Sequence, residues 1–499
     1  MANKIRGGMA WLLAGMAIAV TDVSADTAIT IYSKAQPGAV DAALYRPQTG
    51  SGNSAYTVPG YAIVRQQQTL ELQQGRSEVR LTDVAALIDP TTVHFESLTD
   101  PDGTRVIEQD FRFDLVGTEK LFDRYIDSKI RVDQVVGDRL VTTNGVLLSR
   151  QGGLVVRKDD GSISVITDWQ NVSLADLPGG LMTRPTLVWD IQAKRGGTHA
   201  SRVSYETKGA TWWADYNLQW QPGRDDNVGT LSVSAWVSIL NHSGATYTDA
   251  KLKLIAGDVQ RAQPEPTPMP RAMMMRSAEA DVAEGFSEKE LFEFHLYTLP
   301  RPTTIPNNAT KQIELFPQVT GVPASKRLVY SAQGAGWGRR SFMPAGSDKV
   351  NAFIEFDNKQ TQGLGMPLPA GRVRVSQADD ADGSLEFIGE DVIEHTPRNE
   401  SLRIWVGSAF DVLGERRVTD AKQDQARRQR EETVEVTITN RKKASQPVTV
   451  LENLNGATNW ELLETSDRYD KIDAGQIKFD ITVPADSKKT VRYRVRYSW

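Results

Sequence analysis

The stretch Thr230–Asn241, TLSVSAWVSILN, decides the fold class. Apolar and polar residues alternate along it, as expected for a β-strand with one buried face. The same alternation recurs in Glu432–Asn440 (ETVEVTITN) and Gln476–Pro484 (QIKFDITVP). Helical periodicity is weak and is confined to short stretches at Glu119–Ile126 and Ser287–Phe292. The chain is therefore expected to be all-β and built of several β-sandwiches.

Length and composition narrow the class of protein further. The chain has 499 residues, of which 39% are hydrophobic, so two to four domains are expected. It contains no cysteine, which excludes disulfides, thiolate nucleophiles and Cys-ligated metals. The five histidines are scattered without close pairs, so no histidine-built metal site is predicted.

The N-terminal segment has the form of a secretory signal. Lys4 and Arg6 precede an apolar run at Met9–Val20, and Val23-Ser24-Ala25 places small residues before a cleavage point at Asp26. The run is shorter than the roughly 20 residues of a membrane-spanning helix, which favours removal over anchoring. We therefore expect a periplasmic protein, with a secreted or peripheral envelope location as the alternative, and not an integral membrane protein.

The net charge argues against one class of partner. The whole chain carries a formal charge of −5, and removal of the signal makes it slightly more acidic. Nucleic-acid binding depends on many Lys and Arg contacts to phosphate, so no nucleic-acid partner is predicted.

Turn signals and composition divide the chain into parts. A short helix followed by four or five closely spaced strands suggests a small SH3-like or Sm-like barrel, and the last part has the size of an immunoglobulin-like sandwich. Four prolines and three consecutive methionines mark a flexible loop. The expected parts are a signal peptide at 1–25, an N-terminal β domain at 26–116, a small barrel-like unit at 117–180, a central β-sandwich region at 185–430 with the Pro/Met loop at 263–284, and an immunoglobulin-like sandwich at 431–499.

Several long motifs occur in one order along the second half of the chain. They include Thr211–Tyr216 (TWWADY), Phe294–Thr303 (FHLYTLPRPT), Gly363–Val375 (GLGMPLPAGRVRV) and Phe387–Pro397 (FIGEDVIEHTP). Together they resemble the bacterial envelope family that has an uncharacterised C-terminal domain and is represented by mucoidy-inhibitor-like proteins. The resemblance implies an exported β protein.

The chain departs from that family in one respect. Mucoidy-inhibitor-like members usually carry a long coiled-coil insertion, whereas residues 117–178 here have Gly-rich hairpins and no heptads. A role of the coiled coil is therefore not carried over. The resemblance supplies no catalytic residues.

The densest aromatic cluster consists of Trp212, Trp213, Tyr216, Trp220 and Trp236. The candidate ligand-binding residues within it are Trp212, Trp213 and Tyr216. Exposed aromatic faces would stack on sugar rings or on a proline-rich peptide. Adjacent strand residues point to opposite faces, so one tryptophan is expected in the core and the other at the surface or at a domain junction. Core or interdomain packing is the favoured interpretation of the cluster, because large aromatic side chains dominate buried contacts.

Other patterns carry no specific chemistry. Asp379–Gly383 (DDADG) contains part of a calcium-loop pattern and is interpreted as a hairpin turn. The basic run Arg416–Arg430 is interleaved with acids and is interpreted as a solvated connector, with contact to an anionic lipid or polysaccharide as the alternative. The chain has no nucleophile elbow and no phosphate-binding motif, so no catalytic, cofactor-binding or metal-binding residue is predicted.

These observations favour a non-catalytic envelope protein. It would bind or scaffold an envelope protein or polysaccharide through sandwich surfaces, loops or sheet edges. One alternative is a polysaccharide-binding or carbohydrate-active protein. A second is an outer-membrane β-barrel, because the chain ends in the alternating, aromatic-terminated stretch Val491–Trp499.

Overall fold

The computed structural model describes residues 26–33, 57–82, 84–176, 181–257, 259–260, 286–332, 336–337, 341–342, 348–454 and 459–499. Nearly all regular structure within these ranges is β-strand, which confirms the all-β expectation. No helix in the described ranges is long and apolar enough to cross a membrane. The predicted signal peptide at 1–25 and the Pro/Met loop at 263–284 lie outside the described residues.

The chain divides into two compact units, each assembled from separate segments of sequence. The first contains the described residues of Met1–Thr27, Arg65–Thr82 and Thr92–Tyr205, and the second those of Ala28–Val64, Asp83–Thr91 and Glu206–Trp499. Four strands contribute residues to both units: β1 (Asp26–Ser33), β2 (Gly60–Leu72), β4 (Ile88–Ser97) and β12 (Gly197–Thr207). The domain boundaries expected from the sequence stay predictions.

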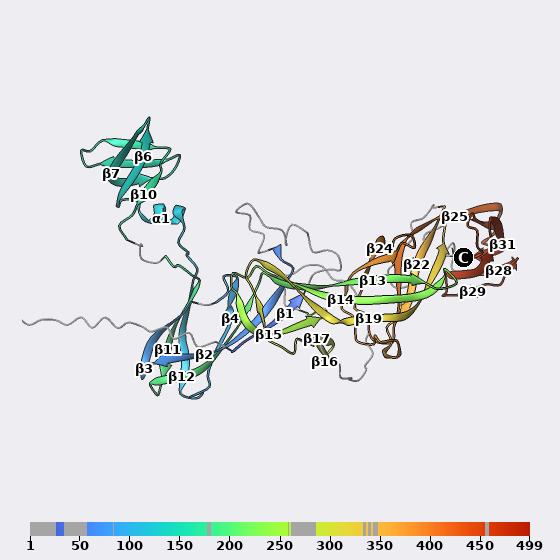
Figure 1. Cartoon of the computed structure of the whole chain (residues 1–499), viewed down its shortest axis with the longest axis horizontal. Helices are drawn as coiled ribbons and strands as arrows, with labels where there is room; N and C mark the ends of the chain where they lie inside the picture. The colour runs from blue at the N-terminus through green and yellow to red at the C-terminus, as the bar shows by residue number, and fades with distance from the viewer. Residues whose placement is uncertain are drawn as a thin grey trace, which may run out of the picture. The chain divides into compact units, whose positions relative to one another are not determined.

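A small five-stranded sheet follows helix α1 (Thr118–Arg124) in the first unit (Figure 1). Its strands pair in the order β10-β6-β7-β8-β9, with β9 and β10 as the two edges. Phe122 of α1 and Tyr125 pack against the buried side chains of the sheet. The strand bounds are β6 (Lys129–Val136), β7 (Arg139–Ser149), β8 (Leu154–Lys158), β9 (Ile163–Ile166) and β10 (Asn171–Ser173). The helix-then-meander order is as expected from the sequence, and hydrogen bonds do not close the sheet into a barrel.

A second sheet of the first unit has three strands in the order β3-β11-β5. These are β3 (Gly75–Leu81), β5 (Thr104–Arg112) and β11 (Thr186–Ala193). Trp189 of β11 is fully buried on one face, and ion pairs such as Arg76–Asp190 cover the other. Leu187, Trp189 and Ile191 of β11 share the buried face, and Asp190 and Gln192 lie on the other, as the alternation of a strand requires.

The second unit is organised around the long strands β13 (Ala210–Pro222), β14 (Val228–Asn241) and β19 (Ala309–Tyr330), which run side by side (Figure 1). The alternating stretch Thr230–Asn241 lies in β14 and buries Leu231, Val233, Val237 and Ile239 on one face, whereas Trp236 is exposed on the other. The sheet continues in the order β24-β23-β13-β14-β19-β22-β25-β26-β31-β28. Its other strands are β22 (Lys349–Asp357), β23 (Gly371–Ala378), β24 (Leu385–Ile393), β25 (Ser401–Asp424), β26 (Gln429–Asn440), β28 (Asn459–Thr465) and β31 (Ser487–Ser498).

The first strand of the described chain, β1 (Asp26–Ser33), pairs in parallel with β15 (Tyr247–Ala256) in the same unit. On its other side, β15 pairs with β17 (Phe294–Thr298) and with β18 (Thr303–Ile305). The helix expected at Ser287–Phe292 is wrong, because Ser287–Leu291 forms β16 and pairs with β17. Pairing with a neighbouring strand here overrides the helix-forming tendency of Glu and Lys.

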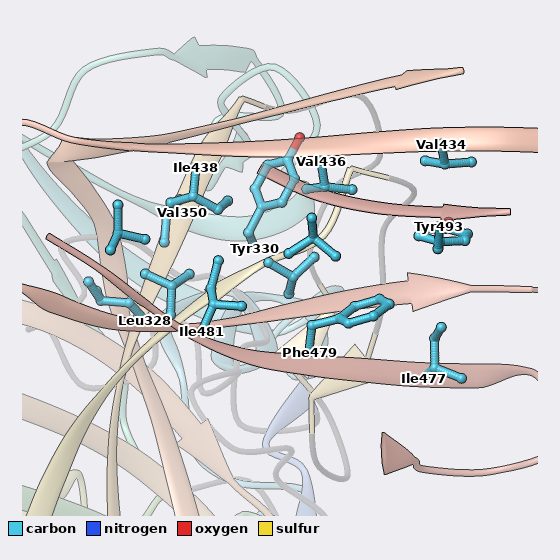
Figure 2. Packing of buried hydrophobic residues seen from close by; sticks show 14 of the residues in the cluster. Leu328, Tyr330, Val350, Val434, Val436, Ile438, Ile477, Phe479, Ile481 and Tyr493 are labelled. Carbon is cyan, nitrogen blue, oxygen red and sulfur yellow. The ribbon is translucent and has the colours of Figure 1, made fainter. Parts of the chain in front are cut away.

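The C-terminal end of the second unit is a two-layered sandwich (Figure 2). One layer is β25-β26-β31-β28, and the other consists of the end of β19 with β27 (Gln446–Asn453), β30 (Gln476–Val483) and β29 (Asp470–Lys471). Apolar residues from both layers fill the core between them, among them Tyr330, Val436, Phe479 and Tyr493. Strands before residue 431 therefore complete the sandwich expected at 431–499.

Candidate functional site

The three aromatic residues chosen from the sequence lie on opposite faces of β13. Trp212 and Tyr216 are buried, at 1% and 2% exposure, on the face that contributes to the core. Trp213 is partly exposed on the opposite face, where it packs against Val58 and Leu240. Strand geometry requires this division, because successive side chains alternate between faces. Trp212 and Tyr216 therefore offer no surface for a ligand to stack on.

The buried aromatic side chains hold a neighbouring proline-containing segment in place. The hydroxyl of Tyr216 donates to the carbonyl oxygen of Pro369 at 2.7 Å, and the hydroxyl of Tyr297 donates to that of Pro367 at 2.9 Å. Trp212 contacts Tyr297 edge-to-face. Burial raises the pKa of both tyrosines well above the ordinary value, so both stay neutral donors.

Polar side chains secure the rest of this segment. The amide nitrogen of Asn358 donates to the carbonyl oxygens of Met366 and Pro397 at 2.8 and 3.1 Å. The imidazole Nδ1 of His395 accepts the backbone N–H of Ala370 at 3.0 Å. The motifs that are far apart in sequence are therefore joined in one cluster, and the segment enters β23 in a fixed position.

The outward face of β13 has an acidic residue at its centre. The Oδ1 atom of Asp215 accepts two hydrogen bonds from Arg372, from Nε at 3.2 Å and from Nη2 at 3.0 Å. Its Oδ2 atom accepts the indole N–H of Trp213 at 2.8 Å and the hydroxyl of Ser238 at 3.2 Å. Asp215 is 6% exposed, and these four bonds compensate for its removal from water.

The network extends sideways across the sheet. The side-chain nitrogen of Gln312 donates to Ser238 Oγ at 3.0 Å, and Arg374 Nε donates to Glu390 at 3.1 Å. Trp236 lies directly opposite Asp215 in the pairing of β14 with β13, and its side chain is 38% exposed. We call this surface of β24, β23, β13, β14 and β19 the Asp215 face. Five strands place a partly exposed indole within a hydrogen-bonded polar surface.

A shallow cleft of about 350 Å³ occurs elsewhere in the second unit, over β19, β22 and β25. It contains two carboxylates, Glu355 and Asp357. Glu355 accepts Arg403 Nε at 3.0 Å, and Asp357 accepts Lys359 Nζ at 2.6 Å. The hydrogen bond from Lys359 lowers the pKa of Asp357. Glycoside hydrolysis needs a carboxyl group with a raised pKa as its acid, so this arrangement does not favour such chemistry.

The Asp379–Gly383 stretch forms the turn between β23 and β24. The carboxylates of Asp379 and Asp382 accept the backbone N–H groups of Ala381 and Ser384 at 2.8 Å each, and Gly383 takes a positive φ of 75°. This is the chemistry of a hairpin turn. Within the described ranges, no group of three or more His, Asp or Glu is placed to hold a metal ion.

The sequence reasoning missed the centre of the polar surface. Asp215 and Arg372 are separated by 157 positions, and the parallel pairing of β13 with β23 brings them together. One local signal was present: Asp215 is a single acidic residue in an otherwise apolar and aromatic strand segment, TWWADY. An acid in such a place requires a buried partner.

The comparisons with known proteins concern the second half of the chain. A domain of unknown function (DUF4139) matches residues 201–499, which include all the motif segments that meet at the Asp215 face. No curated protein and no solved structure matches the chain. The match covers more than half of the sequence, and the chain therefore belongs to the family defined by this domain of unknown function, DUF4139.

Proposed function

We propose that the protein is an exported, non-catalytic binding protein of the bacterial cell envelope. The observation that carries the proposal is the Asp215 face, whose central carboxylate is held by four hydrogen bonds within the protein. A surface with its polar groups already fixed loses little entropy when a partner binds. Groups engaged in this way are suited to recognition rather than to nucleophilic attack.

The proposed location in the cell envelope rests on the N-terminal segment. Strand β1 begins at Asp26, so cleavage before this residue would leave β1 whole as the first element of the mature chain. Ile29 and Ile31 of β1 are fully buried, and β1 pairs along β15. The resemblance to mucoidy-inhibitor-like envelope proteins supports the same location.

The non-catalytic part of the proposal rests on the state of the charged groups. Asp215 and Glu390 at the Asp215 face, and Glu355 and Asp357 in the cleft, each form an ion pair with arginine or lysine. A carboxylate held in this way is occupied by a cation of the protein, whereas a general acid or base must exchange a proton with a substrate.

Fractionation and co-sedimentation test the proposal together. The full chain is expressed in a Gram-negative host, and we expect it in the osmotic-shock fraction with Asp26 as its N-terminus. The purified mature chain is then mixed with washed envelope fragments, and we expect it to sediment with them without release of reducing ends or peptides. A chain that keeps its leader in the cytosol, stays in the supernatant or degrades the envelope would contradict the proposal.

A further inference from the structure

Trp236 is held on the surface by its neighbours. The residues two positions away on its own strand are Ser234 and Ser238, whose small side chains cannot cover an indole. The pairing of β14 with β19 shifts register between Ala235 and Trp236, which is the mark of a β-bulge. Bulges re-aim side chains, and they are common beside functional sites. The exposure of Trp236 is thus built into the backbone of two strands.

The groups around this indole are hydrogen-bonding ones. Asp215 on β13 and Glu314 on β19 lie directly opposite Trp236, one on each side. Asn217 lies opposite Ser234 and Gln312 lies opposite Ser238, so the two amides stand one row to either side of Trp236. Both are exposed. An apolar platform ringed by carboxylates and amides complements a pyranose, which presents a flat C–H face to the ring and hydroxyl groups at its rim.

The charge of the surface narrows the choice of sugar. Arg372 and Arg374 are opposed by Asp215, Glu390 and Glu314, and the arginines are already engaged with Asp215 and Glu390. A surface with one excess negative charge gives no attraction to a polyanion. The charge of the Asp215 face therefore suits a neutral glycan.

An extended peptide fits the same place less well. Strand addition requires a sheet edge with unpaired backbone N–H and C=O groups. Strand β14 is paired with β13 on one side and with β19 on the other, so Trp236 is at the interior of the sheet. A ligand here must approach the face and bind through side chains.

From these observations we infer that the Asp215 face is a binding site for a neutral glycan, with Trp236 as the stacking platform and Asn217 and Gln312 as hydroxyl-binding groups. The inference rests on the proposed binding function and names the ligand class for it. It assigns no cleavage of the glycan.

Calorimetric titration of the mature chain with short β-linked oligosaccharides of glucose and of N-acetylglucosamine tests the inference. Polygalacturonate serves as the anionic comparison. We expect at least one neutral oligosaccharide to bind, and Trp236→Ala to weaken its binding about tenfold or more, as removal of a central aromatic anchor does. Trp236→Phe keeps a smaller platform and should weaken binding less.

Trp405→Ala is the matched control, because Trp405 is 39% exposed and lies on β25, which is not one of the five strands of this face. Its bond to Asp391 of β24 comes from the backbone N–H, which the substitution keeps. This variant should bind the oligosaccharide as the unsubstituted chain does. Scanning calorimetry checks the fold of each variant, and Asn217→Ala replaces Trp236→Ala if the latter unfolds.

Two results would overturn the inference: no binding of any neutral oligosaccharide, or equal binding by Trp236→Ala and the unsubstituted chain. Tighter binding of polygalacturonate than of every neutral sugar would also overturn it. If the chain still sediments with envelope fragments in any of these cases, the binding function stands and only its ligand class is wrong. If sedimentation is lost as well, both fail.

Discussion

Replacement of Arg416 by methionine is expected to destabilise the C-terminal sandwich by about 3–5 kcal/mol. Arg416 Nε donates to Glu452 Oε2 at 2.8 Å inside this sandwich, where Glu452 is fully buried and the Arg416 side chain is 12% exposed. Tyr493 donates its hydroxyl to the same Glu452 oxygen. Tyr330 lies nearby, and its ring occupies the space that a side chain at Gly414 would fill.

The magnitude follows from what the substitution leaves behind. Glu452 Oε1 is buried with no hydrogen-bond partner in the described part of the chain, so Arg416 is the cation that compensates for the charge. Removal of one partner of a buried pair leaves an uncompensated charge in the core, which costs several kcal/mol. Replacement of both partners by apolar residues should recover most of this loss.

The loss is also expected to depend on pH. Burial raises the pKa of Glu452, and Arg416 acts against that rise. Without Arg416 the pKa of Glu452 in the folded state rises further above its ordinary value of 4.5. When the pKa of a carboxyl group is higher in the folded state than in the unfolded state, the folded protein loses stability as the pH rises above the unfolded-state pKa. The deficit of Arg416→Met should therefore grow between about pH 4.5 and neutral pH.

Native-state hydrogen exchange on peptides from β27 and β31 measures the effect within the sandwich. Arg417→Met is the matched control, because Arg417 pairs with Glu415 at the surface and such pairs contribute about 0–1 kcal/mol. The third variant is Arg416→Met with Glu452→Leu. The reasoning is refuted if Arg416→Met costs no more than Arg417→Met, or if the double variant is no more stable than Arg416→Met alone.

Other substitutions test the structure around the Asp215 face and the cleft by thermal unfolding. Tyr216→Phe removes the donor to the buried Pro369 carbonyl, so we expect a loss of about 1–3 kcal/mol, and an unchanged melting temperature would contradict the hydrogen bond. Gly371→Ala would place a Cβ against the carbonyl oxygen of Ala214 in β13, so a lower melting temperature is expected, and an unchanged one would argue against the close approach of β13 and β23. Lys359 lowers the pKa of Asp357 below its ordinary value of 3.8. The ionised Asp357 therefore stabilises the fold, and this stabilisation is lost as the pH falls through the lowered pKa. Asp357→Asn should therefore lose less stability than the unsubstituted chain between about pH 5 and pH 2, and parallel curves would exclude this contribution.

Local alternation predicted most of the strands because its period depends only on neighbouring residues. It placed Trp212 and Trp213 on opposite faces, and turn chemistry identified Asp379–Gly383. At Ser287–Leu291 the residues SEKEL favour a helix, and only pairing with β17 makes them a strand. Such pairing is a tertiary effect that local propensity does not contain.

The long-range polar pairs were beyond the sequence for a related reason. Arg416 stands in a run of basic and acidic residues that indicates a solvated connector, and most of that run is exposed. The inward position of Arg416 follows from its place two residues after Gly414 and four after the buried Val412 on one face of β25. Its partner Glu452 comes from β27, in the opposite layer. The pairing of Arg416 with a buried carboxylate therefore depends on the assembled sandwich and cannot be predicted from the local sequence.

The two longest strands explain why sequence composition alone does not delimit the C-terminal sandwich. β19 pairs with β14 along its first part and with β22 and β27 near its end, and β25 pairs with β22 first and with β26 afterwards. Leu328, Tyr330 and Val412 from these strands lie in the same core as the strands after residue 431. A fragment that begins at residue 431 would lack these side chains and would leave Glu452 without Arg416. The sandwich is therefore the end of a continuous β structure that starts at the Asp215 face, and its stability depends on residues about a hundred positions upstream.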